Sequence, residues 1–67
     1  MKTDVLIRDE GTIVVFESRT KAALQWIKEN VSAEPWQWLG RSLCVDQRYA
    51  DGLVSLLREG GFCMVRT

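Results

Sequence analysis

The sequence contains no histidine, and this absence removes the side chain that most often moves protons at neutral pH. Ser–His–Asp and Cys–His catalytic arrangements are excluded with it. The chain has only two cysteines, Cys44 and Cys63, and they do not form a CxxC pair. Without histidine, the chain lacks the ligands of a four-coordinate zinc site. We therefore expect neither a metal nor a cofactor.

Carboxylates are the remaining candidates for catalysis, but each has a structural explanation. Asp9 and Glu10 lie in a predicted turn, and Asp46 stands where it caps a helix. No glycine-rich phosphate loop precedes a helix. Small-molecule pockets occupy several hundred Å³, for which a domain of 67 residues has little room. We predict that the protein is not an enzyme and has no catalytic, cofactor-binding or small-molecule site.

Net charge is also missing, because nine basic residues balance nine acidic ones. Non-specific binding to nucleic acid needs a basic surface, so we predict that nucleic acid is not the main partner. No apolar run approaches the ~20 residues of a membrane span. Both cysteines have apolar neighbours and no signal segment is evident, so we expect reduced core thiols and a cytoplasmic location.

What the sequence does contain is a large apolar fraction, 46%, with three tryptophans. Its length predicts a single domain over residues 1–67. A domain this small buries only about 60% of the surface that its unfolded chain exposes. Efficient packing or self-association is therefore needed for stability.

The apolar periodicity predicts the order β-β-α-β-α-β. Strands over about 4–8 and 12–17 flank a turn that ends in Gly11, and both faces of the second are apolar, as in a central strand. A helix over 19–30 follows, with Ser18 as its N-cap. Residues 36–45 read as an extended segment interrupted at Gly40. A helix over 47–59, capped by Asp46, and a strand over 62–65 complete the chain.

These elements predict an α+β fold, a two-layer arrangement with a mixed four-stranded sheet and both helices on one face. The second helix carries apolar residues that we assign to its core face: Tyr49, Ala50, Leu53, Val54, Leu56 and Leu57. The other face of the sheet then exposes one side of the second strand, either Val14 with Phe16 or Ile13 with Val15. Such a face is either an interface or a second small core under the loop at 32–40.

The C-terminal half carries a motif that resembles short bacterial and prophage open reading frames. Its residues are Trp38-Leu39-Gly40, Leu43-Cys44-Val45, Arg48-Tyr49, Leu53 and Gly60-Gly61. The resemblance transfers no activity to any residue. It implies that the protein acts by stoichiometric contact with a host protein, as an inhibitor or regulator.

These observations together predict a non-catalytic protein-binding domain. Aromatic residues and arginine dominate binding hot spots, so the expected partner-binding residues are Trp36, Trp38, Arg41, Phe16 and Arg48. A homodimer through the same surface is one alternative. The others are a single-strand nucleic-acid binder, with bases stacked on the tryptophans beside the arginines, and a structural subunit of a larger assembly.

Overall fold

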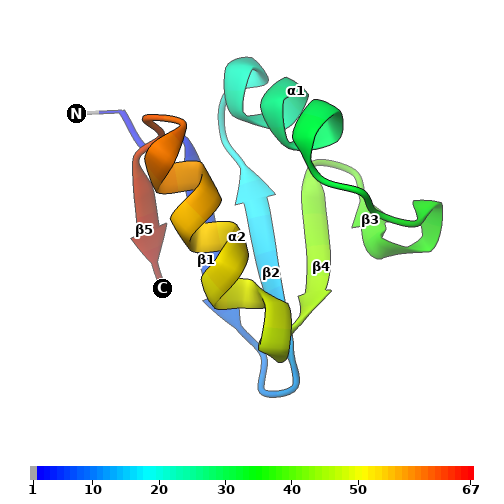
Figure 1. The fold of residues 1–67 in the computed structure, drawn as a ribbon. Helices are drawn as coiled ribbons and strands as arrows, with labels where there is room; N and C mark the ends of the chain where they lie inside the picture. The colour runs from blue at the N-terminus through cyan, green and yellow to red at the C-terminus, as the bar shows by residue number, and fades with distance from the viewer. Residues whose placement is uncertain (1) are drawn as a thin grey trace.

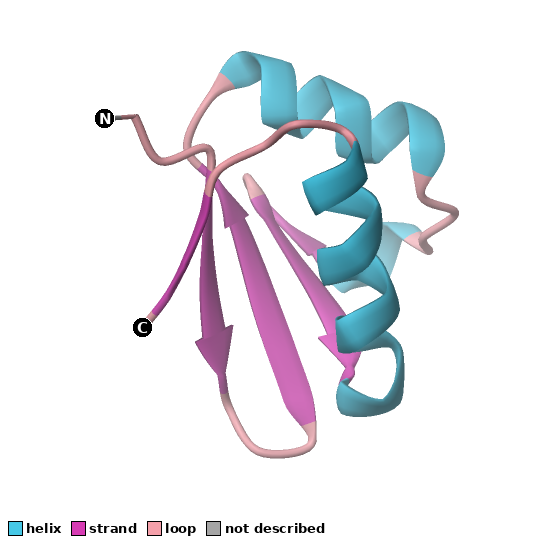
Figure 2. Ribbon diagram, turned by 60° about the vertical axis from the view of Figure 1, so that its left-hand side comes forward, coloured by secondary structure: helices cyan, strands magenta, loops and turns pink. Residues whose placement is uncertain are grey.

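The computed structural model describes residues 2–67 and shows a five-stranded mixed sheet with two helices on one of its faces (Figure 1, Figure 2). The strands are β1 (Val5–Asp9), β2 (Ile13–Ser18), β3 (Trp38–Leu39), β4 (Ser42–Asp46) and β5 (Met64–Arg66). The helices are α1 (Lys21–Asn30) and α2 (Gln47–Glu59), with a 3₁₀ turn, η1, at Pro35–Gln37. The predicted α+β class is confirmed.

The strands lie in the order β3-β4-β2-β1-β5. Strand β2 pairs antiparallel with β1 on one side and with β4 on the other, which confirms that it is a central strand. The pair of β1 with β5 is parallel, and the remaining pairs are antiparallel. The long connection through α2 is therefore what carries the chain from β4, across the sheet, to the opposite edge.

The predicted count of four strands is wrong because the segment at 36–45 folds as a hairpin. Trp38 lies opposite Leu43, and Leu39 lies opposite Ser42. Gly40 makes the reversal at a φ of 61°, a value that side-chain-bearing residues rarely adopt. The sheet gains β3 as an edge strand, and Trp36 lies outside it in η1.

The prediction of Ser18 as the N-cap of α1 is also wrong. The cap is Thr20, whose Oγ1 accepts a hydrogen bond from the backbone N–H of Ala23 at 3.2 Å. The same hydroxyl donates to Oδ1 of Asp4 at 3.1 Å, so it is fixed by the start of β1. Ser18 is instead the last residue of β2, and it is buried. As a result α1 begins two residues later than predicted.

The predicted bounds of α2 are confirmed, and Asp46 caps it by accepting the backbone N–H of Arg48 at 2.9 Å. The helix ends where Gly61 takes a φ of 85°. Strand β5 begins at Met64 rather than at Phe62, because the Phe62 ring packs against Trp26 with centroids 5.5 Å apart. Within residues 2–67, no helix has the length and apolar character needed to cross a membrane.

The core lies between the sheet and the two helices (Figure 2). Its buried members are Val5, Ile7, Val14, Phe16, Ala23, Ile27, Leu43, Val45, Ala50, Leu53 and Leu57. The cysteines do not belong to it. Cys44 is half-buried and Cys63 is exposed, and both are free thiols, so the prediction of two core thiols is corrected. Cys63 leaves the core because it lies in the loop before β5.

Candidate functional site

A groove lies between α2 and the chain that follows α1, and we call it the apolar groove. Its volume is about 1150 Å³. In Figure 1, α2 lies on one side of β4, whereas η1 and β3 lie on the other. The apolar side chains that line it are Ile13, Val31, Trp36, Cys44, Val45, Tyr49, Leu53 and Leu56. The sequence indicated little room for a ligand cavity in so small a domain, and this groove is open to solvent rather than enclosed.

The groove exists because the chain leaves α1 and turns away from α2. Pro35 begins η1, and the side chain of Gln37 then holds η1 against the edge of β4. The Gln37 Oε1 atom accepts the N–H of Glu34 at 2.8 Å, while its Nε2 atom donates to the carbonyl of Cys44 at 3.1 Å. If β3 began one residue earlier, position 37 would pair with Cys44 in the sheet. The side-chain amide of Gln37 takes the place of that strand pairing. The turn leaves Trp36 facing outward.

The two walls of the groove carry the most exposed aromatic side chains of the described chain. Trp36 on η1 is 78% exposed, and Tyr49 on α2 is 66% exposed. Leu56, two turns after Tyr49 on α2, is 47% exposed. Single exposed apolar residues are ordinary on protein surfaces, but a contiguous set around a concave apolar floor marks an interaction site.

The charges at the rim of the groove are paired with each other. Asp46 Oδ1 accepts the backbone N–H of Arg48 at 2.9 Å and its Nε at 3.1 Å. The backbone hydrogen bond, followed by the bond to the guanidinium, lowers the pKa of Asp46, and the carboxylate in turn raises the pKa of Arg48. The guanidinium also lies 5.7 Å from the centroid of the Tyr49 ring. Asp46 therefore stays ionised at neutral pH and has no proton to give to a reaction.

Of the five predicted partner-binding residues, Trp36 lines the groove, and Arg48 contacts two residues that line it, Asp46 and Tyr49. Trp36 forms one wall. The guanidinium of Arg48 lies over the ring of Tyr49, which lines the groove. Trp38 does not join them, because its ring is half-buried against the core and the Nζ of Lys28 lies 5.4 Å from its centroid. Trp38 therefore supports the fold, although it is only two residues from Trp36.

The remaining two predicted residues lie elsewhere. Phe16 is fully buried in the core, so its assignment to a partner surface is corrected: it points from β2 toward the helices. Arg41 lies in the turn before β4, whereas Arg48 follows the other end of that strand. The five residues of β4 separate them by roughly 17 Å. At physiological salt, surface charges more than about 10 Å apart are largely screened from each other. The joint basic patch expected for nucleic acid is therefore not formed.

The open face of the sheet shares Ile13 and Cys44 with the lining of the groove. Arg8, Val15 and Cys44 are register partners across β1, β2 and β4, so they share this face. Val15 is only 8% exposed there, and Ile13 is 39% exposed. Of the two alternatives for β2, Ile13 with Val15 thus takes the open side. A charged neighbour at its centre makes this face a poorer docking surface than the groove.

Two residues of the groove, Tyr49 and Leu56, were predicted to be core. The signal that distinguishes them is the width of the apolar arc on α2. At 100° per residue, the arc from Leu56 to Val54 spans roughly 160°, wider than the ~100° stripe that one buried face requires. The excess lies on the side that faces the groove.

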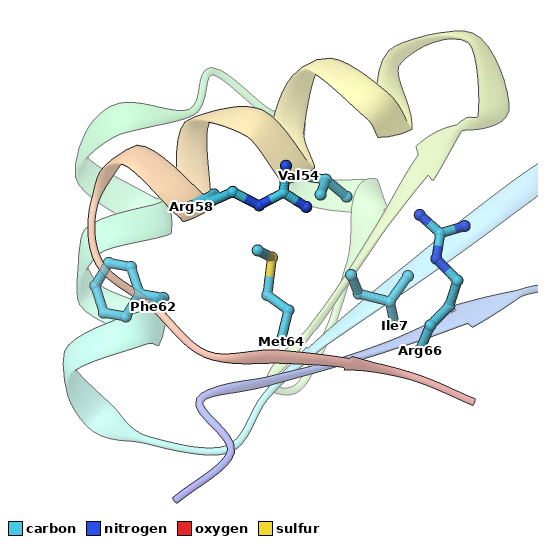
Figure 3. Close-up of a pocket in the computed structure, with 6 residues that line it drawn as sticks. All are labelled: Ile7, Val54, Arg58, Phe62, Met64 and Arg66. Atoms are coloured by element: carbon cyan, nitrogen blue, oxygen red, sulfur yellow. The ribbon is translucent and has the colours of Figure 1, made fainter.

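A smaller pocket of about 250 Å³ lies on the other side of α2 (Figure 3). Ile7, Val54, Phe62 and Met64 form its apolar part, and Arg58 and Arg66 flank it. Neither arginine takes part in an ion pair within residues 2–67. Its volume is below the ~300 Å³ at which small-molecule sites begin, so we regard the groove as the candidate site.

The apolar groove offers mainly apolar contact area, and the free thiol of Cys44 is part of its lining. Its lining is dominated by aliphatic and aromatic side chains, with Asp46 as its one carboxylate among the described residues. No family model matches this chain, and no curated protein or solved structure matches it. What the site does must be inferred from its geometry.

Proposed function

We propose that the chain is a non-catalytic protein-binding domain that acts by stoichiometric contact through the apolar groove. One observation carries the proposal: Trp36 and Tyr49 stand exposed on opposite walls of a concave apolar floor. Tryptophan, tyrosine and arginine are the residues that dominate protein-binding hot spots, and Arg48 completes the set at the rim. Burying the two rings against a partner removes apolar surface that the isolated domain leaves in water.

The chemistry of the groove favours binding over catalysis. Asp46 is held ionised by Arg48, so it is not tuned for proton transfer near neutral pH. The free thiols of Cys44 and Cys63 support the further proposal that the domain works in a reducing compartment such as the cytoplasm.

Site-specific photo-cross-linking in cells tests the proposal. With benzoylphenylalanine in place of Trp36, we expect discrete protein adducts, and the additional change Tyr49→Ala should reduce them several-fold. Benzoylphenylalanine in place of Gln25, an exposed residue on α1, is the matched control and should give none. Equal labelling from both positions, or no adduct from position 36, would show that the groove does not bind protein.

A further inference from the structure

Gly52 stands in the middle of α2, where glycine weakens a helix relative to alanine. Its φ is not positive, and a Cβ atom built onto it would meet no atom within 4 Å. The fold of the single chain therefore gives no reason for glycine at this position. Glycine is also used where another backbone must approach closely, and that reason would come from outside the chain.

Gly52 lies on the part of α2 that lines the groove. Tyr49, Gly52 and Leu56 follow the i, i+3, i+7 spacing of one helix face. Tyr49 is 66% exposed and Leu56 is 47% exposed. Because glycine has no side chain, Gly52 leaves a notch along the helix between these two apolar side chains. A second helix that crosses α2 at this notch can place its own ridges on either side.

We propose that the occupant of the groove is a second copy of this chain, with α2 packed antiparallel on α2 of the partner about a two-fold axis near Gly52. The inference rests on the proposed function, since it names the partner of the same groove. In such a pair Tyr49 of each chain lies opposite Leu56 of the other. The same patch meets itself, which is the requirement of a two-fold interface.

The area available is sufficient for a weak dimer. The exposed parts of Trp36, Tyr49 and Leu56 amount to about 400 Å² on each chain. Together with the flanking polar residues, two copies bury roughly 1,000 Å², the lower end for a specific interface. We therefore expect dissociation constants in the micromolar range rather than the nanomolar range.

The charges beside Tyr49 and Leu56 on α2 are self-complementary. Arg48 and Glu59 lie on the same flank of α2, near its two ends. The Arg48 side chain pairs with Asp46 of its own chain but stays 79% exposed, and Glu59 takes part in no ion pair within residues 2–67. In an antiparallel pair equal flanks face each other, so Arg48 of one chain lies opposite Glu59 of its partner at both ends of the contact. In a parallel pair the same flanks lie on opposite sides of the contact, so Arg48 of one chain would not meet Glu59 of the other. The antiparallel arrangement also sets the helix dipoles in opposite directions.

Sedimentation equilibrium from about 1 μM to roughly 1 mM protein measures the association. We expect a monomer–dimer equilibrium that Trp36→Ala weakens at least tenfold. Glu59→Arg should weaken it about threefold at low salt, and Arg48→Glu added to Glu59→Arg should restore it, because the swapped charges again face each other. Glu29→Arg on α1 makes the same change in net charge and should leave the dimer unaffected.

Gly52→Ala gives the sharpest test, because the change has opposite effects on the two equilibria. The methyl group improves the helix, so the monomer at low concentration should unfold at higher urea. It also fills the notch, so the dissociation constant should rise at least tenfold. Asp51→Ala is the matched control: it improves the same helix on the side away from the groove and should leave the dissociation constant within twofold.

A chain that stays monomeric to 1 mM, or a dimer that ignores both Gly52→Ala and Trp36→Ala, overturns the second-copy inference. The proposed function is judged separately by the cross-link from position 36. A monomer that still gives adducts with another protein keeps the groove as a protein-binding site and excludes the second copy as its occupant. If the dimer is insensitive to these changes and position 36 gives no adduct, the groove is neither the dimer interface nor a protein-binding site.

Discussion

Helix α2 has two apolar faces, and they differ in what lies opposite them rather than in composition. Ala50, Leu53 and Leu57 meet the sheet and are buried. Tyr49 and Leu56 are of similar apolar character but meet the gap that opens where the chain turns away after α1. Leu57 is fully buried, whereas its neighbour Leu56 is 47% exposed. The core and the apolar groove are thus two apolar environments on one helix, one filled by the chain itself and one left open.

This difference shows that apolar periodicity does not by itself indicate which element of the fold covers a residue. The core face is satisfied by strands of the same chain. Under the proposed function, a bound partner covers the groove face. A helix with an apolar arc wider than its own fold can cover is therefore a sign of a partner.

The largest effect should separate the two adjacent leucines. Leu57→Ala removes a fully buried side chain and leaves a cavity, so we expect a loss of about 3 kcal/mol in the free energy of unfolding. Leu56→Ala removes a half-exposed one and should cost less than about 1 kcal/mol in dilute protein, where the chain is monomeric. Urea denaturation followed by circular dichroism measures both.

Similar losses from both leucine variants at low concentration would contradict the comparison, because they would mean that Leu56 is already covered in the monomer. Gln25→Ala, on the exposed face of α1, is a control for truncation itself and should have little effect.

Local signals in the sequence predicted much of this fold. The bounds of α2 follow from Asp46 and the terminal glycines, and the β1–β2 hairpin follows from the turn before Gly11. The N-cap of α1 was misplaced because serine is at least as good a cap by type as threonine, which favoured Ser18 over Thr20. The choice was made by Asp4, which fixes the Thr20 hydroxyl from sixteen residues away. Such a long-range contact has no local signature.

The candidate site was only partly predictable for the same reason. Trp36 stood out as an aromatic residue after a helix break, and it does lie on a groove wall. Whether Trp38 joined it depended on the β3–β4 pairing, which turned a supposed strand into a hairpin. Whether Phe16 is buried or exposed depended on which face of β2 the helices cover. These are decisions of packing between distant segments, and residue type alone does not contain them.

A smaller effect should distinguish Trp36 from Trp38, because one ring is exposed and the other is packed against the core. Trp38 packs half-buried against the core, so Trp38→Ala should cost about 2 kcal/mol of stability. Trp36→Ala should change it by less than about 0.5 kcal/mol, because the ring is 78% exposed. Thermal unfolding of both variants in dilute solution checks the prediction. A Trp36→Ala variant as unstable as Trp38→Ala would mean that Trp36 belongs to the core in solution.

The smallest effect is the loss of helix stability at low pH. It should appear on the groove side of α2 before it appears on the core side. The backbone hydrogen bond from Arg48 lowers the pKa of Asp46 in the folded chain relative to the unfolded chain. The cap therefore stabilises α2 at pH values above the ordinary carboxyl pKa of about 4, and this contribution is lost as the pH falls through the lower folded value. The first turn, which carries Tyr49, should then fray while Leu57 stays packed.

NMR amide shifts between about pH 6 and pH 2 follow this loss, and we expect the Tyr49 amide to move with a midpoint below the ordinary carboxyl range. Asp46→Asn is the control, because asparagine also caps a helix but carries no titrating group, so the Tyr49 transition should disappear in it. If Tyr49 and Leu57 move together in the unaltered chain, the two faces of α2 unfold as one unit. The groove face would then stay folded only as long as the core does. The two faces would differ in solvent exposure but not in stability.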